Sequence, residues 1–452
     1  MPNGAVFVDR LGGTCYNNTQ KRSIDLKCGT EGVRDMEIKR PAYLEQLKIR
    51  ENNGLVKVIT GMRRCGKSYL LFKLFLKDLV ARGVPRDHII TIALDEIAND
   101  RWREPHALYD HVCSLLKDQQ RYYIFLDEIQ YVDRFHEVLN GFLHLDNVDV
   151  YVTGSNSRFL SSDILTEFRG RGDEVRVYPL SFAEYVTGYK GSEEDAFNDY
   201  LTFGGLPRIL ALPTDAQKSK YLTDLFQETY LKDILERHNI RNVSEMEALV
   251  NILASAVGSL TNPKKLARSF HSLAQSAITD KTVKSYLDYL RQAFLIDTAL
   301  RYDIKGKRYI NTPLKIYFND IGLRNARLGF RQIEETHLLE NLIFIELKRR
   351  GFSVDVGLIE LREKGADGSR LRTQLEVDFI AYQGNNKYYL QSAFAIPDAR
   401  KRQQEERPLL QIDDSFKKLI IVGQNLKLKR DEKGITTMGI RQFLLDPDSL
   451  EK

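Results

Sequence analysis

Residues 55–71, LVKVITGMRRCGKSYLL, carry the pattern Gly-x-x-x-x-Gly-Lys-Ser between an apolar run and a segment whose apolar residues recur at helical spacing. The glycines let the main chain curl so that successive N–H groups point inward, and the start of the next helix adds partial positive charge. A strand, a glycine loop and a helix in this order are typical of a phosphate-binding loop. This stretch therefore predicts a nucleotide site within an α/β fold.

The residues of the predicted loop have separate expected roles. Lys67 is expected to reach the β- and γ-phosphates, the Ser68 hydroxyl to ligate Mg²⁺, and Arg63 and Arg64 to keep the loop electropositive. ATP and Mg²⁺ are therefore the predicted cofactors. The predicted nucleotide-binding residues are Gly61, Met62, Arg63, Arg64, Cys65, Gly66, Lys67, Ser68 and Tyr69.

A pair of carboxylates, Asp127 and Glu128, ends the apolar run that starts at Tyr122. Hydrolysis of a nucleoside triphosphate needs one acidic residue near Mg²⁺ and another that activates the attacking water. Asp127 is the predicted metal residue and Glu128 the predicted general base; two solvated carboxylates at a strand end are the alternative. The sequence contains no Asn-Lys-x-Asp motif for reading guanine, which favours ATP over GTP.

Further polar residues follow the next predicted strand. Thr153, Ser155 and Asn156 are sensor candidates for a hydrogen bond to the γ-phosphate or the lytic water, and a structural turn is the alternative for each. Arg171 precedes the last strand of this region. Its guanidinium is a candidate for stabilising transition-state charge at its own nucleotide or at that of a neighbouring subunit. The predicted catalytic residues are Lys67, Glu128, Asn156 and Arg171.

The chain divides into segments by its periodicity. Strands alternate with helices over 36–190, which predicts a parallel sheet with ligands at the carboxyl ends of its strands. Residues 1–35 show no sustained period and predict a disordered extension, and residues 191–245 have a helical pattern. Three helices and a basic hairpin over 246–325 match the plan of a winged helix, and 326–452 predict a mixed α/β unit.

Five segments carry a family resemblance: VITGMRRCGKSYLLF, YYIFLDEIQYVDRF, VYVTGSNSRFL, GRGDEVRVYPLSFAEY and FGGLPRIL. Together they resemble the prokaryotic AAA-like (STAND-related) P-loop ATPases whose C-terminal domain of unknown function resembles a degenerate PD-(D/E)xK nuclease. The resemblance runs from about Met36, the family-like start, to the C-terminus. It implies ATP binding and hydrolysis, a helical lid bearing Gly204-Gly205-x-Pro207, a winged helix, and a restriction-endonuclease-like α/β domain.

Positive charge is concentrated in one segment of the chain. The formal net charge of the whole chain is +5, whereas residues 259–310 hold ten Lys or Arg and four Asp, a net +6. Such a segment can bind DNA phosphates with a helix in the major groove; the alternative is a connector or partner surface with solvated cations. The candidate DNA-binding residues are Lys264, Lys265, Lys281, Lys284, Lys307 and Arg308, with Arg301 and Lys305 also expected on the wing.

The C-terminal segment keeps part of the nuclease pattern. Glu340, Glu376 and Asp378 are carboxylates of the kind that hold Mg²⁺ in a nuclease, but Gln391 stands at the second carboxylate position and Ala393 at the lysine position. A migrated site that uses Glu340 with the two strand carboxylates is the alternative to loss of catalysis. We expect a binding or assembly domain on a nuclease scaffold.

Composition limits the class of protein. The four cysteines show no disulfide or zinc spacing, no apolar run approaches the ~18–20 residues of a membrane span, and no signal-peptide pattern begins the sequence. These features predict a cytoplasmic protein without membrane contact. The predicted function is an ATP-hydrolysing molecular switch that couples nucleotide state to double-stranded DNA, a protein partner or further copies of the chain. The alternatives are an ATP-dependent nuclease and a non-hydrolysing nucleotide-binding regulator.

Overall fold

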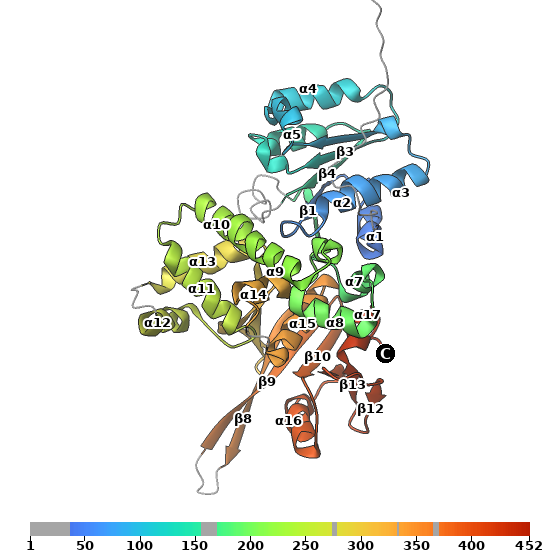
Figure 1. Cartoon of the computed structure of the whole chain (residues 1–452). Helices are drawn as coiled ribbons and strands as arrows, with labels where there is room; N and C mark the ends of the chain where they lie inside the picture. The colour runs from blue at the N-terminus through green and yellow to red at the C-terminus, as the bar shows by residue number, and fades with distance from the viewer. Residues whose placement is uncertain (1–36, 155–169, 274–277, 332–333, 365–369) are drawn as a thin grey trace, which may run out of the picture. The chain divides into compact units, whose positions relative to one another are not determined.

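The computed structural model describes residues 37–154, 170–273, 278–331, 334–364 and 370–452 (Figure 1). These residues belong to one compact unit, Glu37–Lys452. The predicted disordered extension 1–35 and two of the predicted nucleotide contacts, Ser155 and Asn156, lie outside the described residues.

A five-stranded sheet carries the glycine loop. Its strands are β1 (Val56–Thr60), β2 (Ile89–Ala93), β3 (Tyr122–Asp127), β4 (Val148–Thr153) and β5 (Gly172–Arg176). They pair in the order β2-β3-β4-β1-β5, and every pairing is parallel. The predicted parallel α/β fold is therefore confirmed. Because β4 lies between β1 and β3, the loop after β1 and the carboxylates after β3 flank the end of β4.

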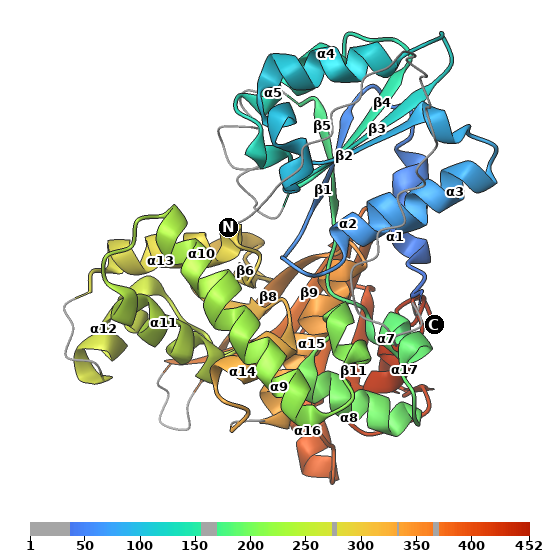
Figure 2. The same ribbon diagram turned by 45° about the horizontal axis from the view of Figure 1, so that its top comes forward.

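Helices cover both faces of this sheet (Figure 2). They are α1 (Pro41–Ile49), α2 (Lys67–Tyr69), the π-helix η1 (Leu70–Phe75), α3 (Leu76–Ala81), α4 (Pro105–Leu115) and α5 (Phe135–Phe142), with the 3₁₀ turns η2 (Arg86–His88), η3 (Ile97–Arg103) and η4 (Ile129–Tyr131). One face packs with α4 and α5 through Leu108 and Phe142, and the other packs with α1 and η1 through Leu47 and Phe75. Since both faces are buried, the strands are apolar at nearly every position.

The described residues that lie between β5 and β6 in the sequence are mainly helical. The elements are α7 (Phe182–Gly188), α8 (Glu193–Phe203), η6 (Pro207–Ala211), α9 (Asp215–Asp224), the π-helix η7 (Leu225–Leu231), α10 (Lys232–Arg237), α11 (Val243–Ser255), α12 (Pro263–Leu273) and α13 (Asp280–Gln292). This is the secondary structure that the sequence pattern predicts. Gly204 and Gly205 form the turn between α8 and η6.

The second sheet has eight strands and corrects one predicted boundary. Its strands are β6 (Ile296–Asp303), β7 (Arg308–Phe318), β8 (Ser353–Lys364), β9 (Arg370–Gln383), β10 (Asn386–Ala393), β11 (Lys417–Val422), β12 (Lys429–Arg430) and β13 (Ile435–Gly439), in the order β12-β13-β11-β10-β9-β8-β6-β7. The hairpin predicted as the wing, β6–β7, pairs with β8, because Arg301 lies opposite Val356. The predicted boundary between 246–325 and 326–452 therefore cuts through one sheet and is wrong.

Two helices cover the faces of the second sheet. α15 (Glu335–Arg349) packs on one face, where Phe344 contacts Phe379, and α16 (Ala399–Leu410) packs on the other through Leu409. Sequence reasoning missed α14 (Ile321–Arg327), β12, β13 and α17 (Ile440–Leu445). None of these has more than seven residues, which is too short to show a period. No described helix combines the length and apolar character that a bilayer span requires.

Candidate nucleotide-binding site

The loop between β1 and α2 has the curled main chain that a phosphate-binding loop needs. Gly61 and Gly66 have φ angles of 138° and 101°, which residues with a side chain rarely adopt. A Cβ on Gly61 would lie 2.1 Å from the carbonyl oxygen of Val177, so only glycine fits beside the segment after β5. The two glycines of the motif are therefore required by the backbone itself.

Lys67 lies inside the curl of the loop. The residue is 5% exposed, and Nζ donates hydrogen bonds to the carbonyl oxygens of Gly61 at 3.0 Å and Met62 at 3.1 Å. The carbonyls of the loop thus hold the ammonium where it can attract an anion bound by the N–H groups of the same loop.

Arg40, just before α1, supports the loop from one side. It is 3% exposed; Nη1 donates to the Cys65 carbonyl at 3.2 Å, and Nη2 donates to the Tyr178 carbonyl at 2.9 Å and to Glu184 Oε2 at 3.1 Å. The guanidinium therefore fixes the loop against the segment that follows β5. Sequence reasoning missed Arg40 because Glu184 is 144 residues away.

Residues of the helical segment support the loop from another side. The Tyr230 hydroxyl donates to the Arg63 carbonyl at 2.7 Å, and the Arg63 guanidinium pairs with Asp233 at 2.7 Å. A Cβ on Gly66 would also lie 3.8 Å from Pro207 Cγ. The segment predicted as a lid thus contacts both the main chain and a side chain of the loop.

The carboxyl ends of β3 and β4 bring both predicted carboxylate residues to the loop. Ser68 Oγ donates to Asp127 Oδ1 at 3.0 Å, and Thr153 Oγ1 donates to the same oxygen. The Thr153 oxygen in turn accepts the Glu128 N–H at 3.0 Å. Four predicted site residues, from the start of α2 and from the ends of β3 and β4, therefore form one chain of hydrogen bonds.

The two carboxylates have different surroundings. Asp127 is 7% exposed; burial raises the pKa of its carboxyl, and the hydrogen bonds from Thr153 and Ser68 oppose that rise. Glu128 is partly exposed and accepts a hydrogen bond from Gln130. A buried carboxylate beside a hydroxyl suits a metal ligand, whereas an accessible carboxylate suits a group that contacts water.

Arg171 lies at the opposite edge of the first sheet. It precedes Gly172, which pairs with Val56 at the amino end of β1, whereas the loop follows the carboxyl end of β1. A strand of this length separates the two edges by about 16 Å, and Arg171 Nη1 donates to Asn140 at 2.9 Å. Of the two predicted alternatives, action of Arg171 on its own nucleotide does not fit this geometry. Action on a neighbouring subunit's nucleotide stays a prediction.

The chain matches known families over most of its length. A family model described as an AAA domain matches residues 53–186, and one described as a Domain of unknown function (DUF8612) matches residues 194–334. An uncharacterized protein of Haemophilus influenzae is 32% identical over 414 residues, which cover 90% of this chain and 98% of that protein. This chain belongs to the family of that protein. An uncharacterized protein of Methanocaldococcus jannaschii is 29% identical over 389 residues, 82% of this chain and 81% of its own length.

Two solved structures each align with 65% of this chain. The Walker-type ATPase of Pyrococcus abyssi aligns with 65% of this chain and 97% of its own, with a TM-score of 0.45 and 16% identity. The Aeropyrum pernix ORC1 protein, solved in complex with DNA, aligns with 65% of this chain and 93% of its own, with a TM-score of 0.27 and 13% identity. The assignment of an AAA-type P-loop ATPase fold rests on the family model and on the loop geometry.

The candidate site is not confined to the AAA domain. Lys67, Asp127 and Glu128 lie within residues 53–186, but Tyr230 and Asp233 lie within the domain of unknown function. That second family model spans the predicted lid and the predicted winged helix together.

The candidate DNA-binding cations are exposed but lie on separate elements. Lys264 and Lys265 are on α12, Lys281 and Lys284 are on α13, and Lys307 and Arg308 are at the β6–β7 turn. Arg308 pairs with Asp303 at 3.5 Å. Arg301, also expected on the wing, is 8% exposed, because its strand is paired on both sides. The prediction that Arg301 forms part of an exposed wing is wrong.

The two positions of β10 that were aligned with nuclease residues do not face the helix that carries Glu340. Leu390 packs in the same core as α15, whereas Ala393 packs in the cluster beside α16. Side chains alternate between the two faces of a strand, so Ser392 lies on the same face as Leu390, toward α15. Gln391 lies on the opposite face. Gln391 and Ala393 therefore lie on the face of the sheet opposite Glu340, and the prediction that they belong to one nuclease-type site with Glu340 is wrong.

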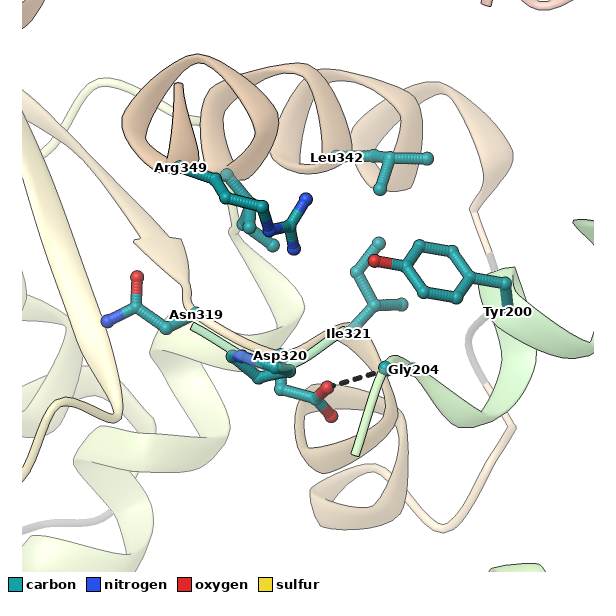
Figure 3. Close-up of a pocket in the computed structure, with 10 residues that line it drawn as sticks. Tyr200, Gly204, Asn319, Asp320, Ile321, Leu342 and Arg349 are labelled. Atoms are coloured by element: carbon teal, nitrogen blue, oxygen red, sulfur yellow. Dashed lines mark hydrogen bonds between the residues drawn. The ribbon is translucent and has the colours of Figure 1, made fainter. Parts of the chain in front are cut away.

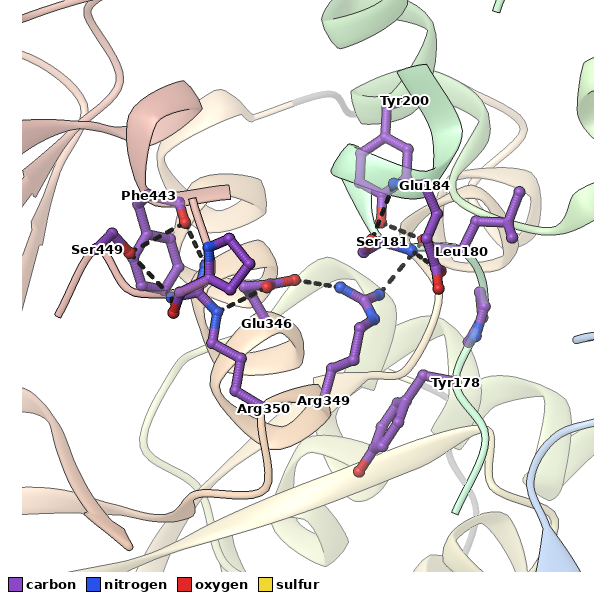
Figure 4. A network of polar contacts seen from close by, with 12 residues as sticks. Tyr178, Leu180, Ser181, Glu184, Tyr200, Glu346, Arg349, Arg350, Phe443 and Ser449 are labelled. Atoms are coloured by element: carbon purple, nitrogen blue, oxygen red, sulfur yellow. Dashed lines mark hydrogen bonds and ion pairs between the residues drawn. The ribbon is translucent and has the colours of Figure 1, made fainter. Parts of the chain in front are cut away.

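Residues at the end of α15 connect α17 and the segment after it to the segment after β5 (Figure 4). Arg350 pairs with Glu346 at 2.8 Å and donates to Ser449 Oγ at 2.9 Å. Arg349 pairs with the same Glu346, and its Nη2 donates to the Leu180 carbonyl at 3.4 Å. This network reaches the segment against which Arg40 holds the loop.

A small pocket lies where α8, α14 and α15 meet, lined among others by Gly204, Asp320 and Arg349 (Figure 3). Asp320 is 2% exposed and accepts hydrogen bonds from the N–H groups of Gly205 and Leu323, both at 2.9 Å. A Cβ on Gly204 would lie 2.5 Å from the Asp320 carboxylate, so glycine is required there. Gly204 is therefore required by the buried carboxyl group, whereas Gly205 is required by the Leu180 carbonyl oxygen, which a Cβ there would approach to 2.4 Å.

Stability is expected to depend on pH through Asp320. Burial raises the pKa of Asp320 to about 6 from the ordinary 3.8, against the hydrogen bonds from backbone N–H groups. A raised pKa in the folded state gives stability that is present below pH ~4 and lost as pH rises through ~6, a change of about 3 kcal/mol. Urea unfolding should show the wild type gaining this amount over Asp320→Asn between pH 7 and pH 4. The matched control is Asp224→Asn, an exposed aspartate. An equal difference at both pH values would contradict the assignment.

Proposed function

We propose that this chain binds ATP in the loop 61–69 and hydrolyses it with Glu128 as the general base. The observation that carries the proposal is the chain of hydrogen bonds from Ser68 through Asp127 and Thr153 to Glu128. It gathers the loop hydroxyl and both acidic residues at the carboxyl edge of the sheet. In such folds ligands bind at this edge.

The described residues fit a Mg²⁺ ion at Ser68 and Asp127. Their two oxygens lie 3.0 Å apart, and hydroxyl and carboxylate oxygens are ligands that Mg²⁺ accepts beside phosphate. When bound, the ion neutralises charge on the β- and γ-phosphates. Lys67 attracts the same phosphates, Glu128 takes a proton from the attacking water, and Thr153 positions Asp127.

Replacement of Lys67 by alanine tests the binding half of this proposal. Charge-assisted hydrogen bonds contribute ~1.5–3 kcal/mol, so ATP affinity measured by calorimetric titration is expected to fall by about tenfold or more. Lys73→Ala, which removes an exposed lysine from η1, is the matched control with unchanged affinity. If wild type and both variants bind ATP equally, the loop is not the site.

The coupling half of the proposal follows from the contacts around Arg63. Tyr230 and Asp233 hold the carbonyl and the guanidinium of this loop residue, so a change in the loop main chain on nucleotide binding reaches η7 and α10. The chain is then a molecular switch whose helical segment responds to ATP. Exposed Arg171 supports a homo-oligomer in which this side chain acts on the nucleotide of a neighbouring copy.

Double-stranded DNA is the proposed partner of the switch, with a protein partner as the alternative. The exposed lysines of α12 and α13 support DNA, because they can neutralise phosphates. A gel shift with duplex DNA, with and without ATP, should show binding at low salt that weakens steeply as salt rises. Absence of binding at low salt would leave the protein partner. A cytoplasmic location fits the two free cysteines among the described residues, Cys65 and Cys113.

Two other functions give different results in simple assays. A non-hydrolysing regulator would bind ATP but release no phosphate above background. An ATP-dependent nuclease would nick plasmid DNA with Mg²⁺ or Mn²⁺ and lose that activity on Asp378→Ala. The environment of Asp378, described next, argues against the nuclease.

A further inference from the structure

Three carboxylates surround one lysine in the second sheet. Lys315 Nζ lies 2.8 Å from Glu340 Oε1, 2.8 Å from Glu376 Oε1 and 3.6 Å from Asp378 Oδ1. The lysine comes from β7, Glu340 comes from α15, and the other two carboxylates come from β9. Lys315 is 3% exposed and Asp378 is 9% exposed, so both lie in the interior of the protein, whereas the Glu376 side chain is 33% exposed.

Backbone geometry brings Asp378 to this point. The register between β8 and β9 shifts at Asp378 and Phe379, so two residues of β9 oppose one residue of β8. Such a β-bulge breaks the strict alternation of side chains. Phe379 packs in the core of the α15 face, and Asp378 reaches Lys315 beside it.

Further donors complete the cluster. The Tyr317 hydroxyl donates to Glu340 Oε1 at 2.7 Å, and the Ser392 N–H donates to Asp378 Oδ2 at 2.8 Å. Tyr317 lies two residues after Lys315 and therefore on the same face of β7. The two most buried carboxylates thus each have a hydrogen-bond donor besides the ammonium.

The electrostatics show a charged lysine. Burial alone would lower the pKa of Lys315, but attraction by Glu340, Asp378 and Glu376 outweighs it, and the pKa is raised. Burial raises the pKa of Asp378 to about 7, and repulsion by Glu340 and Glu376 adds to the rise against the attraction of Lys315. The ammonium is therefore the charge around which the cluster is organised.

The alternative of a migrated nuclease site would place a divalent metal among these three carboxylates, and the arrangement does not fit one. The ammonium lies at 2.8 Å from both Glu340 and Glu376, the distance of a charge-assisted hydrogen bond. A divalent cation bound by these oxygens would lie close to a buried positive charge that repels it.

We infer that the Lys315 ammonium is the resident cation of this cluster, which therefore takes no divalent metal and ties β7 to α15 and β9. The cluster therefore holds these three elements together and does not catalyse DNA cleavage. Because Lys315 belongs to the hairpin predicted as a wing, the hairpin is fixed to the second sheet by charge as well as by strand pairing. DNA that contacts this region is bound and not cut. This inference does not depend on ATP hydrolysis.

Manganese binding to the full chain tests the inference. Bound Mn²⁺ is measured from the loss of the free-ion electron paramagnetic resonance signal in wild type, Asp378→Asn, Lys315→Ala and the double variant. Wild type and Asp378→Asn are expected to bind the same amount, because the ammonium and not a metal occupies the cluster. Lys315→Ala frees three carboxylates and is expected to bind about one additional Mn²⁺ per chain. Asp378→Asn in that background is expected to remove it.

Two results would overturn the inference. The first is lower Mn²⁺ binding by Asp378→Asn than by wild type, which would place a metal in the natural cluster. The second is a folded Lys315→Ala variant, verified by circular dichroism, that binds no additional Mn²⁺. If Lys315→Ala does not fold, the comparison of wild type with Asp378→Asn still decides. Any Mn²⁺ held near Ser68 and Asp127 is common to all four proteins.

Discussion

Replacement of Glu128 by glutamine is expected to lower steady-state phosphate release from ATP by about 10²–10⁴-fold while ATP affinity is retained. Glutamine keeps the size of the side chain and the hydrogen bond of the Glu128 N–H to Thr153, but it cannot accept a proton from water. Phosphate release is measured with a continuous coupled assay, and affinity by calorimetric titration.

Glu137→Gln is the matched control for this variant. Glu137 lies on α5, is exposed and pairs with Arg134 at the surface, so the same chemical change there should leave turnover unaltered. Wild-type turnover in Glu128→Gln would refute the role of general base. Loss of ATP affinity in Glu128→Gln would instead indicate that this carboxylate helps to bind the nucleotide.

Replacement of Arg40 by methionine is expected to lower the free energy of unfolding by about 3–5 kcal/mol. The change leaves the Glu184 carboxylate, 12% exposed, without its ion-pair partner, and frees the Cys65 and Tyr178 carbonyls inside the protein. Since Cys65 belongs to the nucleotide loop, ATP affinity is expected to fall as well. Urea unfolding and calorimetric titration measure the two effects.

An exposed ion pair provides the contrast for Arg40. Lys77 and Glu37 are 68% and 40% exposed, so Lys77→Met should change stability by no more than about 1 kcal/mol. The double variant Arg40→Met with Glu184→Leu should recover part of the loss, because it removes the unpaired buried charge. If Arg40→Met costs no more than Lys77→Met, the buried ion pair does not hold the loop.

The parts of the site that could be predicted are those that occur close together in the sequence. The glycine loop with Lys67 and Ser68 and the carboxylates at the end of β3 each lie within one strand-and-loop unit. Their convergence follows from the rule that parallel strands place their carboxyl ends at one edge. Thr153, predicted at the end of another strand of this sheet, lies beside Glu128 for the same reason.

The parts that could not be predicted depend on pairs far apart in the chain. Arg40 meets Glu184 and Tyr230 meets Arg63 at separations of 144 and 167 residues, and no local pattern marks such partners. In the sequence Lys315 is an ordinary residue of a predicted strand. Its carboxylate partners become evident only when the fold brings α15 and β9 next to it. The wing was predicted from the order of neighbouring helices and strands along the chain. The pairing of β6 with β8 joins residues that are far apart in the sequence, such as Arg301 and Val356, and no local pattern indicates it.

The contacts of the loop with the helical segment have a consequence for how this protein can be divided experimentally. A fragment that stops near residue 190 would contain the whole AAA family match, yet it would lack Phe226 and Tyr230, which belong to the same apolar core as Met62 and Cys65. The main chain of the nucleotide loop would also lose the hydroxyl that binds the Arg63 carbonyl. A fragment that keeps these contacts of the nucleotide loop therefore extends at least through Asp233.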